Sequence, residues 1–136
     1  MDARWRSLVA FAVDLVLVAV FVGIGRASHG EDQSAWIATF WPFAIGLIAG
    51  WAVARGWRRP FSIARTGLPA WVAAVVVGML LRAVSGQGVQ VAFVIVASIV
   101  LGAFLLGWRF LLVALDRAAS RGANTPGPVS FFLRRR

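Results

Sequence analysis

Two charged residues, Asp14 and Arg109, stand inside stretches of sequence that are otherwise apolar. Asp14 falls about a third of the way along the run 8–24, where an ionisable group costs about 2.5 to 3.5 kcal/mol on insertion scales. A charge at that cost is expected to have a partner. Arg26 lies about 120° from Asp14 around a helix, so the partner must come from another helix, a second copy of the chain or water.

Arg109 is the preferred partner for Asp14. It lies between Trp108 and Phe110 in the last apolar run, at nearly the same membrane depth as Asp14 if successive runs cross in opposite directions. The sequence therefore predicts an Asp14–Arg109 ion pair as a candidate intramembrane charged site. In the alternative, the side chain of Arg109 extends to the lipid headgroups, and the sequence identifies no partner for Asp14.

A second group of polar residues, Arg26, His29 and Arg82, follows the first and third apolar runs. We interpret these three as a candidate outer vestibule, whose arginines would favour an anionic solute. One histidine beside two acids offers too few ligands for a metal ion. The sequence also holds no cysteine and none of the common nucleotide-binding or hydrolase motifs, so we expect no cofactor, no metal and no enzyme activity.

Four apolar runs must position these residues. The chain has 136 residues, of which 60% are hydrophobic and 14% charged, a composition typical of a membrane protein. Most runs approach the roughly 20 residues that cross the hydrocarbon layer, and Asp14 within the first favours a retained span over a signal peptide. The sequence predicts an all-α bundle of four transmembrane helices over 1–116, with spans near 8–25, 35–54, 68–84 and 89–112, and a mobile basic tail over 117–136.

The arginines predict the orientation of the bundle. With the N-terminus inside, only Arg26 and Arg82 fall in outer loops. The other arginines in the loops and termini lie on the cytoplasmic side, as the positive-inside rule requires. Both termini are therefore expected in the cytoplasm, in the plasma membrane of a prokaryote. Topology accounts for the net charge of +9, so no nucleic-acid partner is expected. The same orientation predicts an aromatic belt at the inner interface, formed by Trp5, Trp51, Trp57, Trp71 and Trp108.

The connection 55–67 mixes arginines with aromatic residues, and it is expected to lie on the inner leaflet. A topology signal with interfacial anchoring is favoured, and recognition of anionic lipid is the alternative.

Small residues in the later runs predict close helix packing, because they let backbones approach each other in lipid. Packing within one chain is favoured, and a homodimer or another membrane protein remains a candidate partner. A short repeated pattern suggests two tandem helical hairpins. It consists of Arg26-Ala27 before Gly30 and Arg82-Ala83 before Gly86. The packing candidates are Gly46, Gly50, Gly78, Gly102 and Gly107.

Over about residues 8–112 the chain resembles the small four-span prokaryotic membrane proteins numbered thirty fifty-four among the domains of unknown function. The resemblance implies a membrane location and a set of candidate functional positions, and it implies no activity. The matching features are Asp14, Gly25-Arg26 with Ser28-His29, Trp41-Pro42-Phe43 with Gly46, Gly78 with Arg82, and Gly107-Trp108-Arg109.

Two functions remain open. The first is a small permease or channel-like protein, for an unknown solute or ion, with its charged site at Asp14. The alternative is a non-transporting structural or accessory membrane subunit. A transport site needs charges that converge on a cavity, whereas a structural subunit satisfies its charges in closed pairs.

Overall fold

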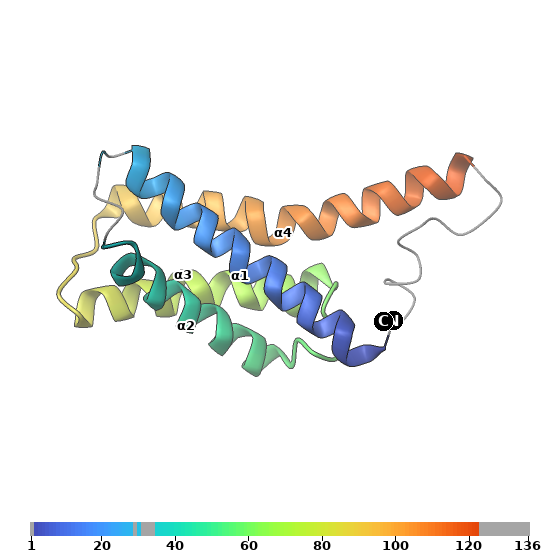
Figure 1. The fold of residues 1–136 in the computed structure, drawn as a ribbon, viewed down its shortest axis with the longest axis horizontal. Helices are drawn as coiled ribbons and strands as arrows, with labels where there is room; N and C mark the ends of the chain where they lie inside the picture. Colours follow the sequence, from blue (N-terminus) through green and yellow to red (C-terminus); the bar gives the residue numbers. More distant parts are fainter. Residues whose placement is uncertain (1, 29, 31–34, 123–136) are drawn as a thin grey trace.

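The computed structural model describes residues 2–28, 30 and 35–122, and the regular structure of these residues is helical. Four long helices lie alongside one another in the order α1 (Ala3–Ser28), α2 (Trp36–Ala54), α3 (Leu68–Val84) and α4 (Val91–Gly122), as Figure 1 shows. A π-helical turn, η2 (Ile63–Gly67), leads directly into α3. All four helical segments are long and apolar enough to cross a bilayer. The chain is therefore a multi-pass membrane protein, and the predicted all-α bundle is confirmed.

The helix bounds differ from the predicted spans mainly at α4. This helix continues to Gly122, ten residues past the predicted span and six into the predicted tail, because Ala118 and Ala119 favour helix. The rest of the predicted mobile tail, residues 123–136, lies outside the described residues.

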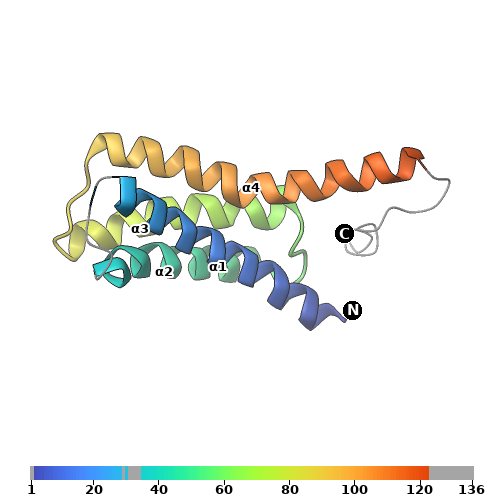
Figure 2. The same ribbon diagram turned by 45° about the horizontal axis from the view of Figure 1, so that its top comes forward.

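The two ends of the bundle carry different connections. We call the end where α1 and α3 begin and α2 finishes end A, and the opposite end, where α2 and α4 begin, end B. The helix α4 runs past end A, so its last residues extend beyond the other three helices (Figures 1 and 2).

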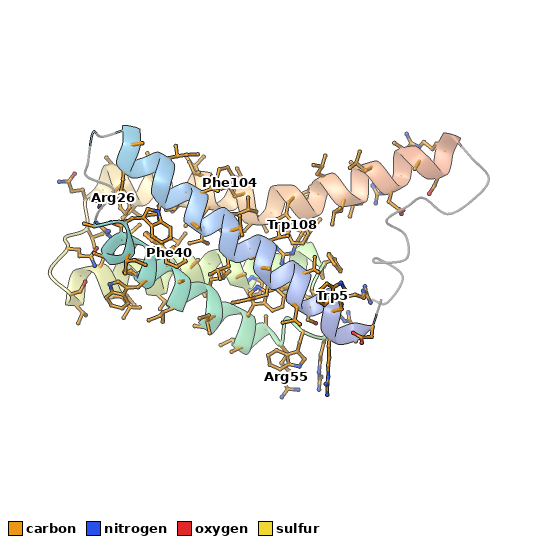
Figure 3. The ribbon with its side chains drawn as sticks, viewed as in Figure 1. Trp5, Arg26, Phe40, Arg55, Phe104 and Trp108 are labelled. Atoms are coloured by element: carbon orange, nitrogen blue, oxygen red, sulfur yellow. The ribbon has the colours of Figure 1, made fainter. Side chains whose placement is uncertain are left out.

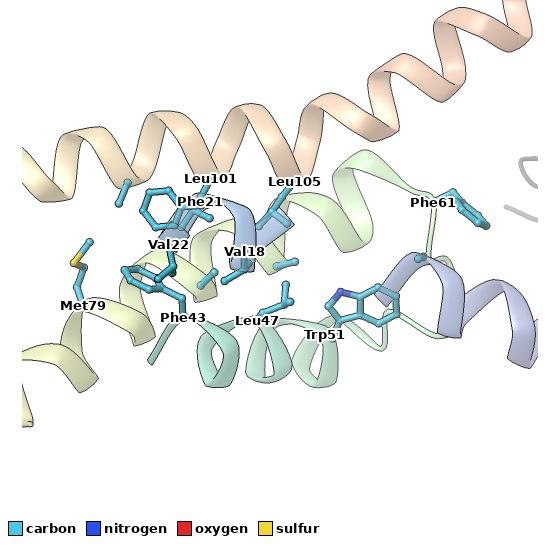
Figure 4. Close-up of a cluster of buried hydrophobic side chains, with 14 residues drawn as sticks. Val18, Phe21, Val22, Phe43, Leu47, Trp51, Phe61, Met79, Leu101 and Leu105 are labelled. Atoms are coloured by element: carbon cyan, nitrogen blue, oxygen red, sulfur yellow. The ribbon is translucent and has the colours of Figure 1, made fainter. Parts of the chain in front are cut away.

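The core is built from a regular stripe on α1. Ala10, Asp14, Val18 and Val22 are buried at every fourth position, whereas Val16 between them is 59% exposed. This spacing keeps one face of α1 toward the bundle and leaves the rest of the helix for lipid. Asp14 therefore belongs to the packed face of its helix. Figure 4 shows Val18 and Val22 of this stripe among side chains of the other helices, namely Phe43, Leu47 and Trp51 of α2 and Leu101 and Leu105 of α4.

The closest backbone approach joins α2 to α3. A Cβ atom on Gly46 would lie 2.7 Å from the carbonyl oxygen of Ala73, and one on Gly50 would lie 2.7 Å from that of Pro69. Both glycines lie on the face of α2 that approaches α3. The two most closely packed helices, α2 and α3, therefore belong to different hairpins of the suggested repeat. The tandem repeat itself stays a prediction.

The other packing glycines divide into two cases. Gly78 lies against the ring of Phe43 and Gly102 against the indole of Trp71, so both leave room for an aromatic side chain. A Cβ atom on Gly107 would meet no neighbouring atom of the described residues within 4 Å, so its packing role stays a prediction.

Candidate functional site

Asp14 of α1 and Arg109 of α4 form a fully buried, two-bond ion pair. Nη1 of Arg109 donates to Oδ1 of Asp14 and Nη2 donates to Oδ2, each over 2.8 Å. Both side chains have no exposed surface. Parallel bonds of this kind fix the geometry of both groups and are stronger than bonds between neutral groups. The two residues of the predicted pair are thus in contact and tie α1 to α4, while their role as a functional site stays a prediction.

Two tryptophans complete the surroundings of the carboxylate. Nε1 of Trp51 donates to Oδ2 of Asp14, and Nε1 of Trp108 donates to Oδ1, again over 2.8 Å each. Figure 3 places Trp108 between α1 and α4, and Figure 4 places Trp51 at the end A side of the core. An indole suits this position because it offers one N–H donor on a large apolar body.

The guanidinium of Arg109 also holds the connection between α2 and α3. Its Nε donates to the carbonyl oxygen of Pro60 over 3.1 Å, and Nη1 donates to that of Leu105 over 2.7 Å. Gly67 leaves room for the arginine, since a Cβ atom there would lie 3.1 Å from Cδ of Arg109. The group formed by Asp14, Trp51, Trp108, Arg109 and the Pro60 carbonyl, which we call the Asp14 cluster, thus joins α1, α2, α4 and the connection.

The chemistry of the Asp14 cluster is that of a satisfied structural ion pair. A carboxylate accepts about four hydrogen bonds, and Asp14 receives four, two on each oxygen. Burying two charges is costly, and the cost is offset only when the geometry is good and the remaining donors and acceptors find partners. The cluster meets that condition, so Asp14 offers no vacant acceptor position to a solute.

Gly56 sets the position of Trp51 and gives a test of the cluster. A Cβ atom on Gly56 would overlap Cε3 of Trp51 and would lie 3.0 Å from Cγ2 of Thr66. We expect Gly56→Ala to displace the indole from Asp14 and to lower the free energy of unfolding by about 1 kcal/mol. Denaturant titration in detergent micelles measures this change. Gly23→Ala is the matched control, because its Cβ atom would lie at 3.8 Å from Nε1 of Trp36, and equal losses in the two variants would contradict the prediction.

Arg26 and Arg82 of the candidate vestibule lie away from the Asp14 cluster, at end B. Nη1 of Arg26 donates to Oγ1 of Thr39 over 2.7 Å, and Nη1 of Arg82 donates to Oε1 of Gln87 over 3.1 Å. The guanidinium of Arg82 also lies 4.6 Å from the ring centre of Phe93. The vestibule stays a prediction, and its third member, His29, lies outside the described residues. Within those residues, no group of three or more His, Cys, Asp or Glu side chains is placed to hold a metal ion.

Sequence reasoning missed the tryptophans, the proline and the glycines of the site. Trp51 and Trp108 were expected to face the lipid interface, yet both indoles point to Asp14. A signal for Trp51 was present, because Phe43, Leu47 and Trp51 follow one another at four-residue spacing on the packed face of α2. Gly56 and Gly67 carry no such signal, since glycine is needed there only because of where the side chains of Trp51 and Arg109 lie in the folded chain.

A family model described as "Protein of unknown function (DUF3054)" matches residues 11–112, a range that includes every member of the Asp14 cluster. No curated protein and no solved structure matches the chain.

Proposed function

Because the chain belongs to the DUF3054 family of proteins of unknown function, we propose its role from the geometry of the Asp14 cluster alone. The role is that of a non-transporting structural or accessory membrane subunit. In it, the charges of Asp14 and Arg109 fasten the helices of one chain to each other. No catalytic step is assigned to the cluster.

The observation that supports this proposal is that the carboxylate of Asp14 is buried and all of its acceptor positions are filled. A transport site must exchange a proton or solute with water, so its charged group needs an accessible or vacant position. Asp14 has no exposed surface, and four donors from two other helices occupy it. A solute could reach the carboxylate only after at least one of these bonds had broken. The permease hypothesis is therefore the less favoured of the two.

The proposed location is the cytoplasmic membrane of a prokaryote, with end A toward the cytoplasm. The positive-inside rule supports this orientation, because end A and the extension of α4 carry most of the exposed arginines. Both termini would then be cytoplasmic. The exposed arginines of this end are Arg4, Arg55, Arg58, Arg65, Arg117 and Arg121.

The proposal predicts that the protein supports no flux. Intact protein reconstituted in liposomes under an imposed membrane potential is expected to pass protons and small anions no faster than protein-free liposomes. The physical reason is that Asp14 has neither a vacant acceptor position nor contact with water. A pH-sensitive and a halide-sensitive dye inside the liposomes measure the two fluxes, and a protonophore added at the end proves that the vesicles are sealed.

Asp14→Asn and Arg109→Gln decide between the two functions. Each variant is first checked for a monodisperse, helical state in detergent. Flux in the intact protein that disappears in a folded Asp14→Asn variant would overturn the proposal and support a permease with its site at Asp14. Absence of flux in all three proteins supports the structural role.

A further inference from the structure

The connection between α2 and α3 at end A is held in one conformation by three parts of the chain. Oγ of Ser7 on α1 donates to the carbonyl oxygen of Trp57 over 2.9 Å, and Nε of Arg109 on α4 donates to that of Pro60. Within the connection, Oγ1 of Thr66 donates to the carbonyl oxygen of Arg59 over 2.7 Å. The arginines of this connection therefore project from a fixed backbone.

Arg55 occupies a backbone conformation that usually belongs to glycine. The helix α2 ends in a Schellman motif, in which the N–H of Arg55 donates to Ala52 and the N–H of Gly56 donates to Trp51. Arg55 has φ of 51°, the left-handed region, and it is the only non-glycine residue with positive φ among the described residues. Glycine is the common choice at such a position, since it carries no steric penalty there. The chain thus has an arginine at a position where the backbone conformation favours glycine.

The side chains around this position have the chemistry of a phosphate site at a membrane surface. Arg55, Arg58 and Arg65 are exposed, and none of them forms an ion pair with a carboxylate in the part of the chain that the structure describes. Trp57 is 53% exposed and Trp5 is 57% exposed. Figure 3 shows Arg55 and Trp5 projecting from the bundle at the same end. Guanidinium groups bind phosphate through paired N–H donors, and tryptophan favours the level of the headgroups.

We propose that Arg55, Arg58 and Arg65 bind the phosphate of an anionic phospholipid, with Trp57 and Trp5 beside it in the headgroup region. A lipid fits better than free phosphate because the exposed Trp57 lies between Arg55 and Arg58 in the chain, at the end of a membrane-spanning bundle. This site goes beyond a topology signal. A topology signal needs positive charge alone, whereas a binding site also needs the fixed backbone and the constrained arginine described above.

The test is binding of phosphatidylglycerol to the full chain in a neutral detergent, measured by native mass spectrometry and by the rise in thermal stability. Phosphatidylcholine is the lipid control. We expect Arg55→Gln/Arg58→Gln to weaken phosphatidylglycerol binding roughly tenfold or more, because each basic group near an anionic surface contributes about a factor of five. The matched control is Arg117→Gln/Arg121→Gln, which removes the same charge from the extension of α4 and is expected to change binding less than about twofold.

Three results would overturn the site. Equal losses in the two double variants would mean attraction to net charge only, and equal binding of phosphatidylcholine would mean no recognition of anionic lipid. Displacement of phosphatidylglycerol by equimolar inorganic phosphate would mean that the arginines recognise free phosphate. If the double variant does not fold, Arg65→Gln serves in its place, because Arg65 lies in η2, where its N–H still donates to Oγ of Ser62.

Discussion

Asp14→Ala is expected to lower the free energy of unfolding by about 3 to 5 kcal/mol, the range for breaking a buried ion pair by removing one partner. The variant leaves the guanidinium of Arg109 buried without a counter-charge and removes the acceptor of two indole N–H groups. Denaturant titration of the protein in mixed micelles, followed by circular dichroism, measures the loss.

The double variant Asp14→Ala/Arg109→Met separates the charge from the packing. It removes the uncompensated guanidinium, so we expect it to be more stable than Asp14→Ala alone, because an apolar replacement of a buried pair is often tolerated. The control is Asp116→Ala on α4. Oδ1 of Asp116 has no hydrogen-bond partner among the described residues, and a change within about 0.5 kcal/mol is expected. If Asp14→Ala were as stable as the intact protein, the ion pair would not contribute to the stability of the fold.

Gly46→Leu is expected to be the second most damaging change, with a loss of about 3 kcal/mol, at the upper end for overpacked cores. A Cβ atom on Gly46 would lie 2.7 Å from the carbonyl oxygen of Ala73 and 2.9 Å from Cα of Ala74. Both atoms belong to the backbone of α3, so no side chain can rotate away, and the two helices would have to separate. Unfolding in the same micelles measures the effect.

Gly107→Leu provides the matched control, since it makes the same substitution in another span. A Cβ atom on Gly107 would meet no neighbouring atom within 4 Å. Leucine also favours helix over glycine by about 0.5 to 1 kcal/mol, so the control is expected to be neutral or slightly stabilised. Similar losses at both positions would mean that the approach of α2 to α3 is not the cause.

The sequence was sufficient for the fold because the signals involved are local or carry a large cost. Runs of apolar residues near the length of a bilayer crossing predict spans without any tertiary information. The Asp14–Arg109 pair was predictable for a similar reason, since two isolated charges in apolar spans at one depth have few other partners. The helix α4 continues past the predicted span because the residues after Asp116, including Ala118 and Ala119, are compatible with helix.

The details of the Asp14 cluster depend on tertiary contacts that leave little trace in sequence. A tryptophan near the end of a span looks the same whether its N–H meets a headgroup or a buried carboxylate, so Trp51 and Trp108 were placed wrongly. Gly56 and Gly67 matter because of atoms supplied by Trp51 and Arg109, and the second of these lies far along the chain. No spacing rule identifies such glycines.

The two charged residues of the cluster are separated by 95 positions, and this separation has a consequence for biosynthesis. Spans emerge from the ribosome in order, so the first enters the membrane well before the last has been made. Until then its carboxylate has no guanidinium partner, and a chain terminated early, after α3, never acquires one. Closure of the ion pair therefore requires α4, and a chain that stops after α3 leaves the carboxylate of Asp14 without this partner.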